Sequence, residues 1–208
     1  GFEDSNANDP ASSMPSGWTR NNNGEASWNY GQISGNAGPT DEPSFPYLMA
    51  TNLAGVYGSN ANDILTGPTY SLPADSRASL TFDHWACVES GFDGAYIEIK
   101  VNNGNWNHFD PGGFYTHSSN MGPFSGTNTP VFGQVQCTSS GATYIVTDTT
   151  FDHKVADLSQ YAGDDVRFRY RLQADSIWHY GGWYLDNVGV SIANYGEGGD
   201  WLSPAFNA

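Results

Sequence analysis

A carboxylate stands in the middle of an apolar stretch near the end of the chain. Residues 176–192 read SIWHYGGWYLDNVGVSI, and Asp186 and Asn187 interrupt its hydrophobic residues. The stretch has the composition of a buried strand, where an unpaired charge costs several kcal/mol or more. Asp186 therefore needs a cation, a proton or a set of hydrogen-bond donors, such as the backbone N–H groups of a turn.

Three of the seven cationic residues alternate along one segment. Arg167, Arg169 and Arg171 are spaced by two within DDVRFRYRLQAD, residues 164–175. This spacing places them in a row on one face of a strand. A row of guanidinium groups suits carboxylates or sulfates, as on acidic polysaccharides. The alternative, which we favour, is a solvent-exposed face whose cations offset acidic neighbours.

Aromatic residues are abundant, with seven Trp and twelve Tyr. Aromatic faces stack on the C–H surfaces of sugar rings, so exposed ones could form a glycan-binding platform. Trp85, Trp106, Trp178 and Tyr180 are the best candidates, because we expect them beside loops or pointing outward. Large aromatic side chains are more often structural, however, and core packing is the competing interpretation for each.

The sequence contains no recognisable catalytic motif. Asp83-His84 and Asp152-His153 are adjacent pairs, but neighbours on a strand point to opposite faces, so neither pair forms a dyad by itself. His84 shares its predicted face with apolar residues and is expected in the core. GxSxG, HExxH and phosphate-loop patterns are absent from the chain. We therefore expect a non-catalytic protein; the alternative is a carbohydrate-active enzyme, a polysaccharide lyase or glycosidase, using Tyr, His and Glu from separate strands.

The charge balance limits the classes of partner. Seven Lys+Arg against 22 Asp+Glu give a net charge of −15, which argues against nucleic acid and anionic membranes. No apolar run is long enough for a membrane span. The acidity favours cations, and Ca²⁺ is the one that oxygen-rich loops bind. The competing interpretation is solubility in an extracellular medium.

The chain has two cysteines, Cys87 and Cys137. They suit a disulfide in a secreted or cell-surface protein, and two free buried thiols are the alternative. We favour the disulfide because the rest of the composition is typical of extracellular proteins. We also expect the chain to be a domain of a larger secreted protein.

Short alternating segments separated by turn signals dominate the chain. The clearest strands are 78–89, 94–101, 164–175 and the end of 176–192. A turn at Asn103-Gly104 predicts a hairpin, and residues 110–143 are expected to be a long loop region. No long stretch has a helical period. The pattern predicts an all-β, single-domain β-sandwich of two antiparallel sheets, most simply a jelly roll, over residues 1–193, with residues 194–208 as a tail on the surface.

Several segments together resemble the MAM-like jelly-roll domains of bacterial secreted proteins. They are GFED and PSGWT, YLMATNLAGVYGSNANDILTGPTYSL, HWACVESGFDGAYIEIKVNNGNW, LSQYAGDDVRFRYRLQAD and GGWYLDNVGV, in that order. Such domains occur in surface adhesins and in the non-catalytic C-terminal part of immune-inhibitor-A-like metallopeptidases. The resemblance covers roughly residues 1–193 and implies a fold without catalytic machinery. The segment 105–143 and the cysteine pair depart from the common pattern.

The resemblance also implies an answer for Asp186. In jelly rolls of this kind the first and last strands lie close together, and related modules hold a structural Ca²⁺ there. We therefore predict a Ca²⁺ bound by Glu3 and Asp186, with Asp93 as a weaker candidate ligand. The expected function is that of an accessory module, which binds a polysaccharide or protein surface or stabilises neighbouring domains of the full-length protein.

Overall fold

The computed structural model describes residues 14–21, 28–44, 46–119 and 128–194. Glu3 and the expected tail after residue 194 lie outside these ranges. Both ends of the predicted domain therefore stay predictions.

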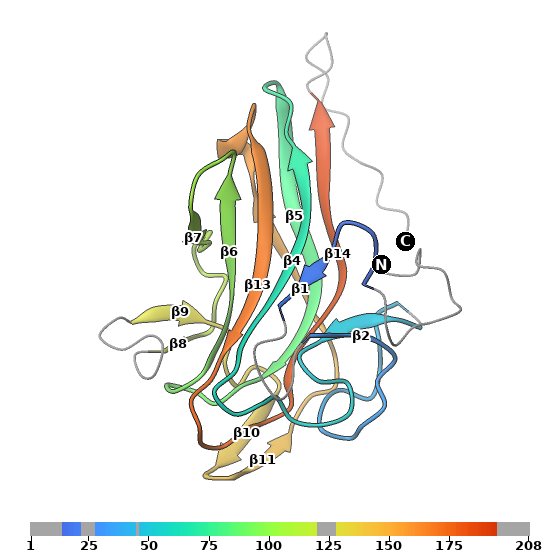
Figure 1. Ribbon diagram of the computed structural model, residues 1–208, viewed down its shortest axis with the longest axis vertical. Helices are drawn as coiled ribbons and strands as arrows, with labels where there is room; N and C mark the ends of the chain where they lie inside the picture. The colour runs from blue at the N-terminus through green and yellow to red at the C-terminus, as the bar shows by residue number, and fades with distance from the viewer. Residues whose placement is uncertain (1–13, 22–27, 45, 120–127, 195–208) are drawn as a thin grey trace.

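Two five-stranded antiparallel sheets face each other and form a β-sandwich (Figure 1), which confirms the predicted fold class. Sheet A has the order β1-β4-β13-β6-β7, with bounds Thr19–Arg20, Asn62–Ser71, Asp165–Gln173, Gly94–Val101 and Trp106–His108. Sheet B has the order β12-β5-β14-β3-β2, with bounds Asp152–Asp157, Ser76–Cys87, Gly182–Asn194, Leu48–Ala50 and Asn29–Gly31.

Alternation of apolar and polar residues explains why the central strands have one buried and one outer face. In β13 the buried residues Val166, Phe168, Tyr170 and Leu172 alternate with arginines on the outer face. The inward side chains of both sheets meet in one core, where the ring of Tyr170 packs 5.8 Å from that of Trp183. Burying such aromatic rings removes a large apolar area from water, and this burial is the main force that holds the two sheets together.

The segment 110–143 is more ordered than its loop-like composition predicts. Phe114 and Phe132 are buried in the core, and Phe132 forms a bridge to Ala95 of β6. The segment also contains β8 (His117–Ser119), β9 (Thr129–Val131) and β10 (Cys137–Ser140), which pairs with β11 (Thr143–Val146). The prediction of one long loop was wrong because Phe114 and Phe132 pack in the core, although most of their neighbours in the sequence are polar.

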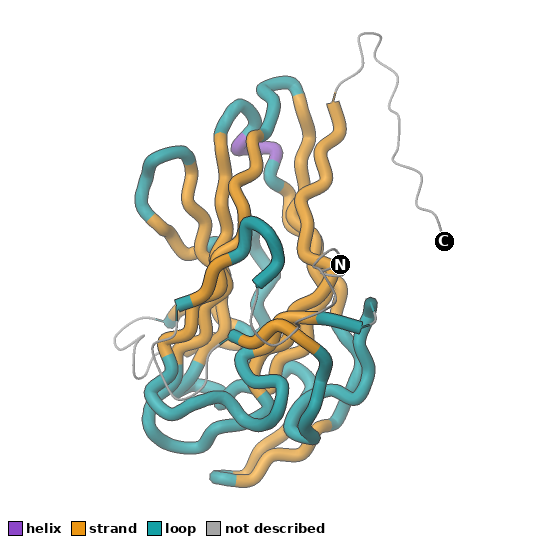
Figure 2. Tube along the Cα trace, turned by 45° about the vertical axis from the view of Figure 1, so that its right-hand side comes forward, coloured by secondary structure: helices purple, strands orange, loops and turns teal. Residues whose placement is uncertain are grey.

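Most loops gather at one end of the sandwich, which also carries the β10–β11 hairpin (Figure 2). A disulfide joins Cys87, at the end of β5, to Cys137, at the start of β10, with the two Cα atoms 5.5 Å apart. The expected disulfide is thereby confirmed. The other end of the sandwich carries a single 3₁₀ turn, η2 (Ser159–Tyr161). Within the ranges given above, no helix has the length and apolar character needed to span a membrane.

Candidate metal centre

Three loops meet at the loop-rich end of the sandwich. The β3–β4 loop contacts the β13–β14 loop through two backbone hydrogen bonds, from Tyr57 N to the Tyr180 carbonyl at 3.2 Å and from Asn60 N to the Asp175 carbonyl at 2.7 Å. The third loop joins β5 to β6 and turns tightly, because Asp93 N donates to the Glu89 carbonyl at 3.1 Å. These loops bring residues far apart in the sequence into contact.

Three carboxylates form an acidic cluster. Two of them come from the β5–β6 loop and the third comes from the β13–β14 loop. One oxygen from each of Glu89, Asp93 and Asp175 lies within 4.8 Å of the others. Asp93 is fully buried, Glu89 is 5% exposed and Asp175 is half-buried. Three oxygen ligands at such short separations could hold a metal ion.

Hydrogen bonds fix the orientation of Asp93. The Tyr57 hydroxyl donates to Asp93 Oδ2 at 2.6 Å, and the backbone N–H of Asp175 donates to Oδ1 at 2.8 Å. Burial, together with the charge of Asp93, raises the pKa of Tyr57 well above its usual value, so the phenol keeps its proton and acts as the donor. The same hydroxyl accepts a hydrogen bond from Glu89 N at 3.1 Å.

Glu89 differs from Asp93 in its partners. Among the described residues, no hydrogen-bond donor reaches the Glu89 carboxylate, although this side chain is 5% exposed. Burial and, after it, the charges of Asp93 and Asp175 together raise the pKa of Glu89 to about 7. A carboxylate held this close to two others favours either a proton or a cation.

The pKa of Asp93 is also raised to about 7. Burial is the largest cause, and the hydrogen bonds from Tyr57 and from the Asp175 backbone act in the opposite direction. Near neutral pH the cluster therefore holds protons unless a cation replaces them. Carboxylate oxygens are hard ligands, which suit Ca²⁺ or Mg²⁺ better than softer metals.

Exposed apolar side chains come from the same three loops. Val56, Phe92, Ile177 and Trp178 are each next to, or within three residues of, a residue of the site, and all four are exposed. Trp178 is 43% exposed and has a φ of 57°, a left-handed conformation that costs energy in a bulky residue. Strain of this kind persists where the surrounding structure enforces it, and it is frequent at binding sites.

The sequence singled out Asp93 but not the other two members of the cluster. The spacing Glu89-x-x-x-Asp93 across a glycine-containing turn was a signal that could have pointed to the pair. Asp175 follows a different strand, and its approach to Asp93 depends on the pairing of β13 with β6. Local sequence holds no sign of that contact.

Asp186 is fully buried in β14, as its neighbours predicted. Its carboxylate accepts hydrogen bonds from Ser44 N at 2.8 Å and Asn187 N at 2.6 Å, and the Ser44 hydroxyl lies 2.9 and 3.0 Å from its two oxygens. These contacts match the backbone-donor alternative for this residue. Because Glu3 lies outside the described residues, the pairing of Glu3 with Asp186 around an ion stays untested.

Two of the four candidate glycan-binding aromatics are in the core. Trp85 is fully buried, and its indole N–H donates to the Asp148 carbonyl at 2.8 Å; Tyr180 is fully buried and donates to the Gly141 carbonyl at 2.8 Å. The outward placement expected for Trp85 is therefore wrong, and Tyr180 lies in a loop as expected but does not expose its ring, since the segment from β10 to residue 148 covers both. Trp106 is half-buried, and Trp178 is exposed.

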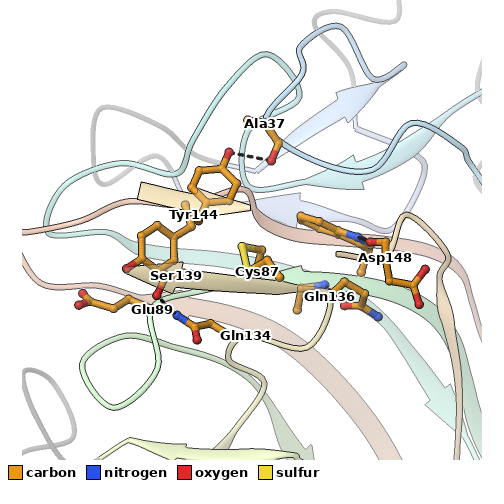
Figure 3. Close-up of a disulfide and its surroundings, with 12 residues drawn as sticks. Ala37, Cys87, Glu89, Gln134, Gln136, Ser139, Tyr144 and Asp148 are labelled. Carbon is orange, nitrogen blue, oxygen red and sulfur yellow. Dashed lines mark hydrogen bonds between the residues drawn. A yellow bond between two sulfur atoms is a disulfide. The ribbon is translucent and has the colours of Figure 1, made fainter. Parts of the chain in front are cut away.

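The disulfide lies directly beside this covering segment. Figure 3 shows the disulfide of Cys87 next to this segment, with the Tyr144 hydroxyl reaching the Ala37 carbonyl at 2.8 Å. The side-chain oxygen of Gln136 also accepts a hydrogen bond from Ala86 N at 2.8 Å. Because Glu89 follows Cys87 by two residues, the disulfide restrains the strand end that carries one member of the acidic cluster.

The arginine row lies on the outer face of sheet A, as its spacing predicted. Arg169 makes a two-pronged ion pair with Glu98, at 2.5 and 2.9 Å. Arg171 donates to the Asn62 side chain at 2.8 Å, and Arg167 donates to the Gly67 carbonyl at 2.7 Å. Glu98 is thus an acidic neighbour of both Arg169 and Arg171, as the favoured interpretation of a charge-balancing face requires.

The structure pairs an aspartate and a histidine that are distant in sequence. His153 Nδ1 lies 2.7 Å from Asp83 Oδ1, because β12 and β5 pair these two positions. His84 is fully buried and receives the Trp183 indole N–H at 3.3 Å; burial lowers its pKa well below the usual value. His84 is therefore a packed core residue, as expected.

Comparison with known proteins gives distant similarities. No family model matches the chain, so the MAM-like resemblance stays a prediction. A segment of Bacillopeptidase F from Bacillus subtilis (strain 168) is 28% identical over 187 residues, which cover 88% of this chain and 10% of that protein. The chain thus spans about a tenth of the length of this relative.

Solved structures with a similar course of the chain include two bacterial domains. The K1 cleaved adhesin domain of Lys-gingipain from Porphyromonas gingivalis W83 is 16% identical, with 88% of this chain and 94% of that one covered and a TM-score of 0.43. CBM35 from Paenibacillus barcinonensis is 12% identical, with 85% and 93% covered and a TM-score of 0.38. A function for the chain therefore has to be inferred from its own residues.

Proposed function

We propose that the chain is a non-catalytic extracellular accessory module, which holds a structural Ca²⁺ in the acidic cluster and binds a glycan or protein surface with the loops around it. The observation that carries this proposal is the convergence of two features on the same three loops. The acidic cluster joins the loops from within, and exposed apolar side chains, including the strained Trp178, lie on the same loops outside.

The chemistry of the cluster favours a hard divalent cation. Ca²⁺ takes six to eight oxygen ligands at about 2.3–2.6 Å and tolerates irregular geometry, whereas Mg²⁺ demands a nearly ideal octahedron. Glu89, Asp93 and Asp175 would supply side-chain oxygens from two loops. Glu89, which has no donor among the described residues, is the ligand that gains most from a cation.

The compartment is inferred from the disulfide and the charge. Disulfides persist in oxidising environments, and the bridge between Cys87 and Cys137 is therefore suited to the extracellular space. Extracellular Ca²⁺ is abundant enough to occupy sites of modest affinity, with dissociation constants of about 10⁻⁴–10⁻³ M.

A binding panel tests this proposal. Retention on insoluble polysaccharides and on a glycan array is measured with Ca²⁺ and with EDTA, for the wild type, Trp178→Ala and the control Ile145→Ala, which removes another exposed apolar side chain on β11. We expect retention in Ca²⁺ that is lost in EDTA and in W178A but kept in I145A. Retention that is unaffected by EDTA and by Trp178→Ala would contradict the proposal. Release of soluble product from a polymer would contradict it as well.

A further inference from the structure

The outer face of sheet A concentrates the few cations of this acidic chain. The chain has seven Lys+Arg and a net charge of −15. Four of the seven lie on this face, on the adjacent strands β6 and β13: Lys100, Arg167, Arg169 and Arg171. Such a concentration of cations on an acidic chain suggests that this face binds an anionic partner.

The strand register places four residues in one line across the sheet. Arg167 is paired with Thr69 of β4 on one side and with Lys100 of β6 on the other, and Lys100 is paired with Trp106 of β7. Side chains directly opposite each other on antiparallel strands lie about 4.5–5.5 Å apart at Cβ. Arg167 and Lys100 therefore form a pair of like charges, which destabilises a sheet unless an anion lies nearby.

The adjacent cations on the same face already have partners. Arg169 is engaged by both oxygens of Glu98, and one of these oxygens also lies 3.6 Å from Arg171 Nη1. By contrast, no carboxylate of a described residue forms an ion pair with Arg167 or Lys100. The charge of the Arg167–Lys100 pair is thus left for something else to neutralise.

A β-bulge fixes the direction of Arg167. The register between β4 and β13 shifts between Arg167 and Arg169, at the position of Gly67-Pro68. The Gly67 carbonyl there accepts a hydrogen bond from Arg167 Nε at 2.7 Å. The two terminal nitrogens of Arg167 have no hydrogen bond to a described residue, so the guanidinium is held by one edge while the other stays available.

This pair lines a hollow of about 360 Å³, within the range of small-molecule sites. The other lining residues include Thr69, Asn103, Trp106 and Asp165. Asp165 accepts a hydrogen bond from the Ser71 hydroxyl at 2.5 Å and keeps its negative charge, so an anionic ligand has to bind on the side of the hollow formed by Arg167 and Lys100. Thr69 and Asn103 are exposed, and their side chains make no hydrogen bond to a described residue.

We propose that this hollow binds the carboxylate or sulfate group of an acidic sugar. The terminal nitrogens of Arg167 and the Lys100 ammonium receive the anionic group, which relieves their mutual repulsion. Trp106, held in place by the Arg169 guanidinium 4.6 Å from its ring, contacts the face of the sugar ring. Thr69 and Asn103 donate to and accept from sugar hydroxyls.

This anion site is separate from the acidic cluster, because Lys100 and Arg167 lie at the opposite ends of β6 and β13 from Asp93 and Asp175. The inference goes beyond the proposed function, because it adds a second surface and defines the charge of its ligand. The net charge of −15 repels polyanions at long range, so recognition depends on the short-range contacts of Arg167 and Lys100; salt screens both the repulsion and these contacts.

Matched polymers test the inference. Affinity electrophoresis and calorimetry at low salt compare polygalacturonate with its methyl ester, dextran sulfate with dextran, and poly-glutamate as an acidic peptide. The double variant Arg167→Ala/Lys100→Ala is set against Arg77→Ala/Lys154→Ala, which removes the same charge from sheet B. The first pair of polymers distinguishes a carboxylate as the ligand, and the second distinguishes a sulfate.

We expect the wild type to bind one acidic polysaccharide in preference to its neutral counterpart. The Arg167/Lys100 variant should lose about tenfold or more in affinity, whereas the control double variant keeps it. Equal loss in both double variants, equal binding of acidic and neutral polymers, or poly-glutamate bound as tightly as the acidic polysaccharide would overturn the inference. Neutral-glycan binding that needs Trp178 and survives the Arg167/Lys100 substitutions would still support the proposed function alone. Melting curves confirm that both variants fold.

Discussion

The hydroxyl of Tyr57 lies 2.6 Å from Oδ2 of Asp93, and this contact ties the β3–β4 loop to the acidic cluster. The two residues are 36 positions apart in the sequence. Because the same hydroxyl accepts from Glu89 N, a single phenol orients two members of the cluster. The geometry of the candidate metal centre therefore depends on a residue that is not itself one of its three carboxylates.

Tyr57→Phe should destabilise the protein by about 1–3 kcal/mol, since it removes the donor to Asp93 Oδ2 and the acceptor of the Glu89 N–H. Denaturant unfolding measures the loss. Tyr70→Phe is the control, because the Tyr70 hydroxyl is half-buried and makes no hydrogen bond to a described residue. Equal stability of the two variants would show that the Tyr57 hydroxyl does not organise the cluster.

Without Ca²⁺, stability should fall as pH rises between about pH 4 and pH 7. The folded-state pKa values of Glu89 and Asp93 are about 7, above the ordinary range of carboxyl groups. The folded state therefore binds protons that the unfolded state has already released, and raising the pH removes this advantage. Excess Ca²⁺ should flatten the fall, because the cation replaces the protons. Melting curves at several pH values, with Ca²⁺ and with EDTA, test this. If Tm depended on pH equally in Ca²⁺ and in EDTA, protons and Ca²⁺ would not compete for the same carboxylates.

Asp63 provides an independent test of buried charge. Its carboxylate is fully buried, neither oxygen has a hydrogen-bond partner among the residues that the structure describes, and burial raises its pKa to about 7. Asp63→Asn should raise stability at pH 8, on the order of 2 kcal/mol, and have much less effect at pH 5. Asp75→Asn, on an exposed turn, should leave stability unchanged at pH 8 and at pH 5. A loss of stability at both pH values would mean that the Asp63 charge has a compensating partner.

Removing the disulfide should weaken both the fold and the candidate metal centre. Cys87→Ala/Cys137→Ala opens a loop with a sequence separation of 50 and should cost about 2–4 kcal/mol. Glu89 lies two residues beyond Cys87, so Ca²⁺ affinity should fall as well. Calorimetric titration of the double variant measures this effect; unchanged affinity would show that the β5 end is rigid without the bridge.

The strands could be predicted from the sequence because their residues alternate locally. In β13 the apolar positions from Val166 to Leu172 identify the buried face without knowledge of any other strand. Trp85 shows the limit of this reasoning. Alternation placed it on the outer face of β5, but the outer face is covered there by a segment some 60 residues further along the chain, which the indole contacts at Asp148.

The candidate metal centre was only partly predictable for the same reason. Asp93 stands in a conspicuous turn, yet Asp175 and Tyr57 reach it from loops that only the sheet topology brings together. Likewise, the repulsion between Arg167 and Lys100 follows from their register across β13 and β6. The sequence gives the residue types, whereas the pairing of strands decides which of them meet.

Thermal unfolding of the wild type in Ca²⁺, Mg²⁺ or EDTA tests the central claim most directly. Ca²⁺ binding to the folded state should stabilise it by about 2.7 kcal/mol at a free concentration of a hundred times Kd, which corresponds to a rise in Tm of about 5–10 °C. Asp93→Asn and Asp175→Asn should abolish this rise, and Asp75→Asn should keep it. A wild-type Tm that is the same in Ca²⁺ and in EDTA would contradict a structural cation bound by Glu89, Asp93 and Asp175.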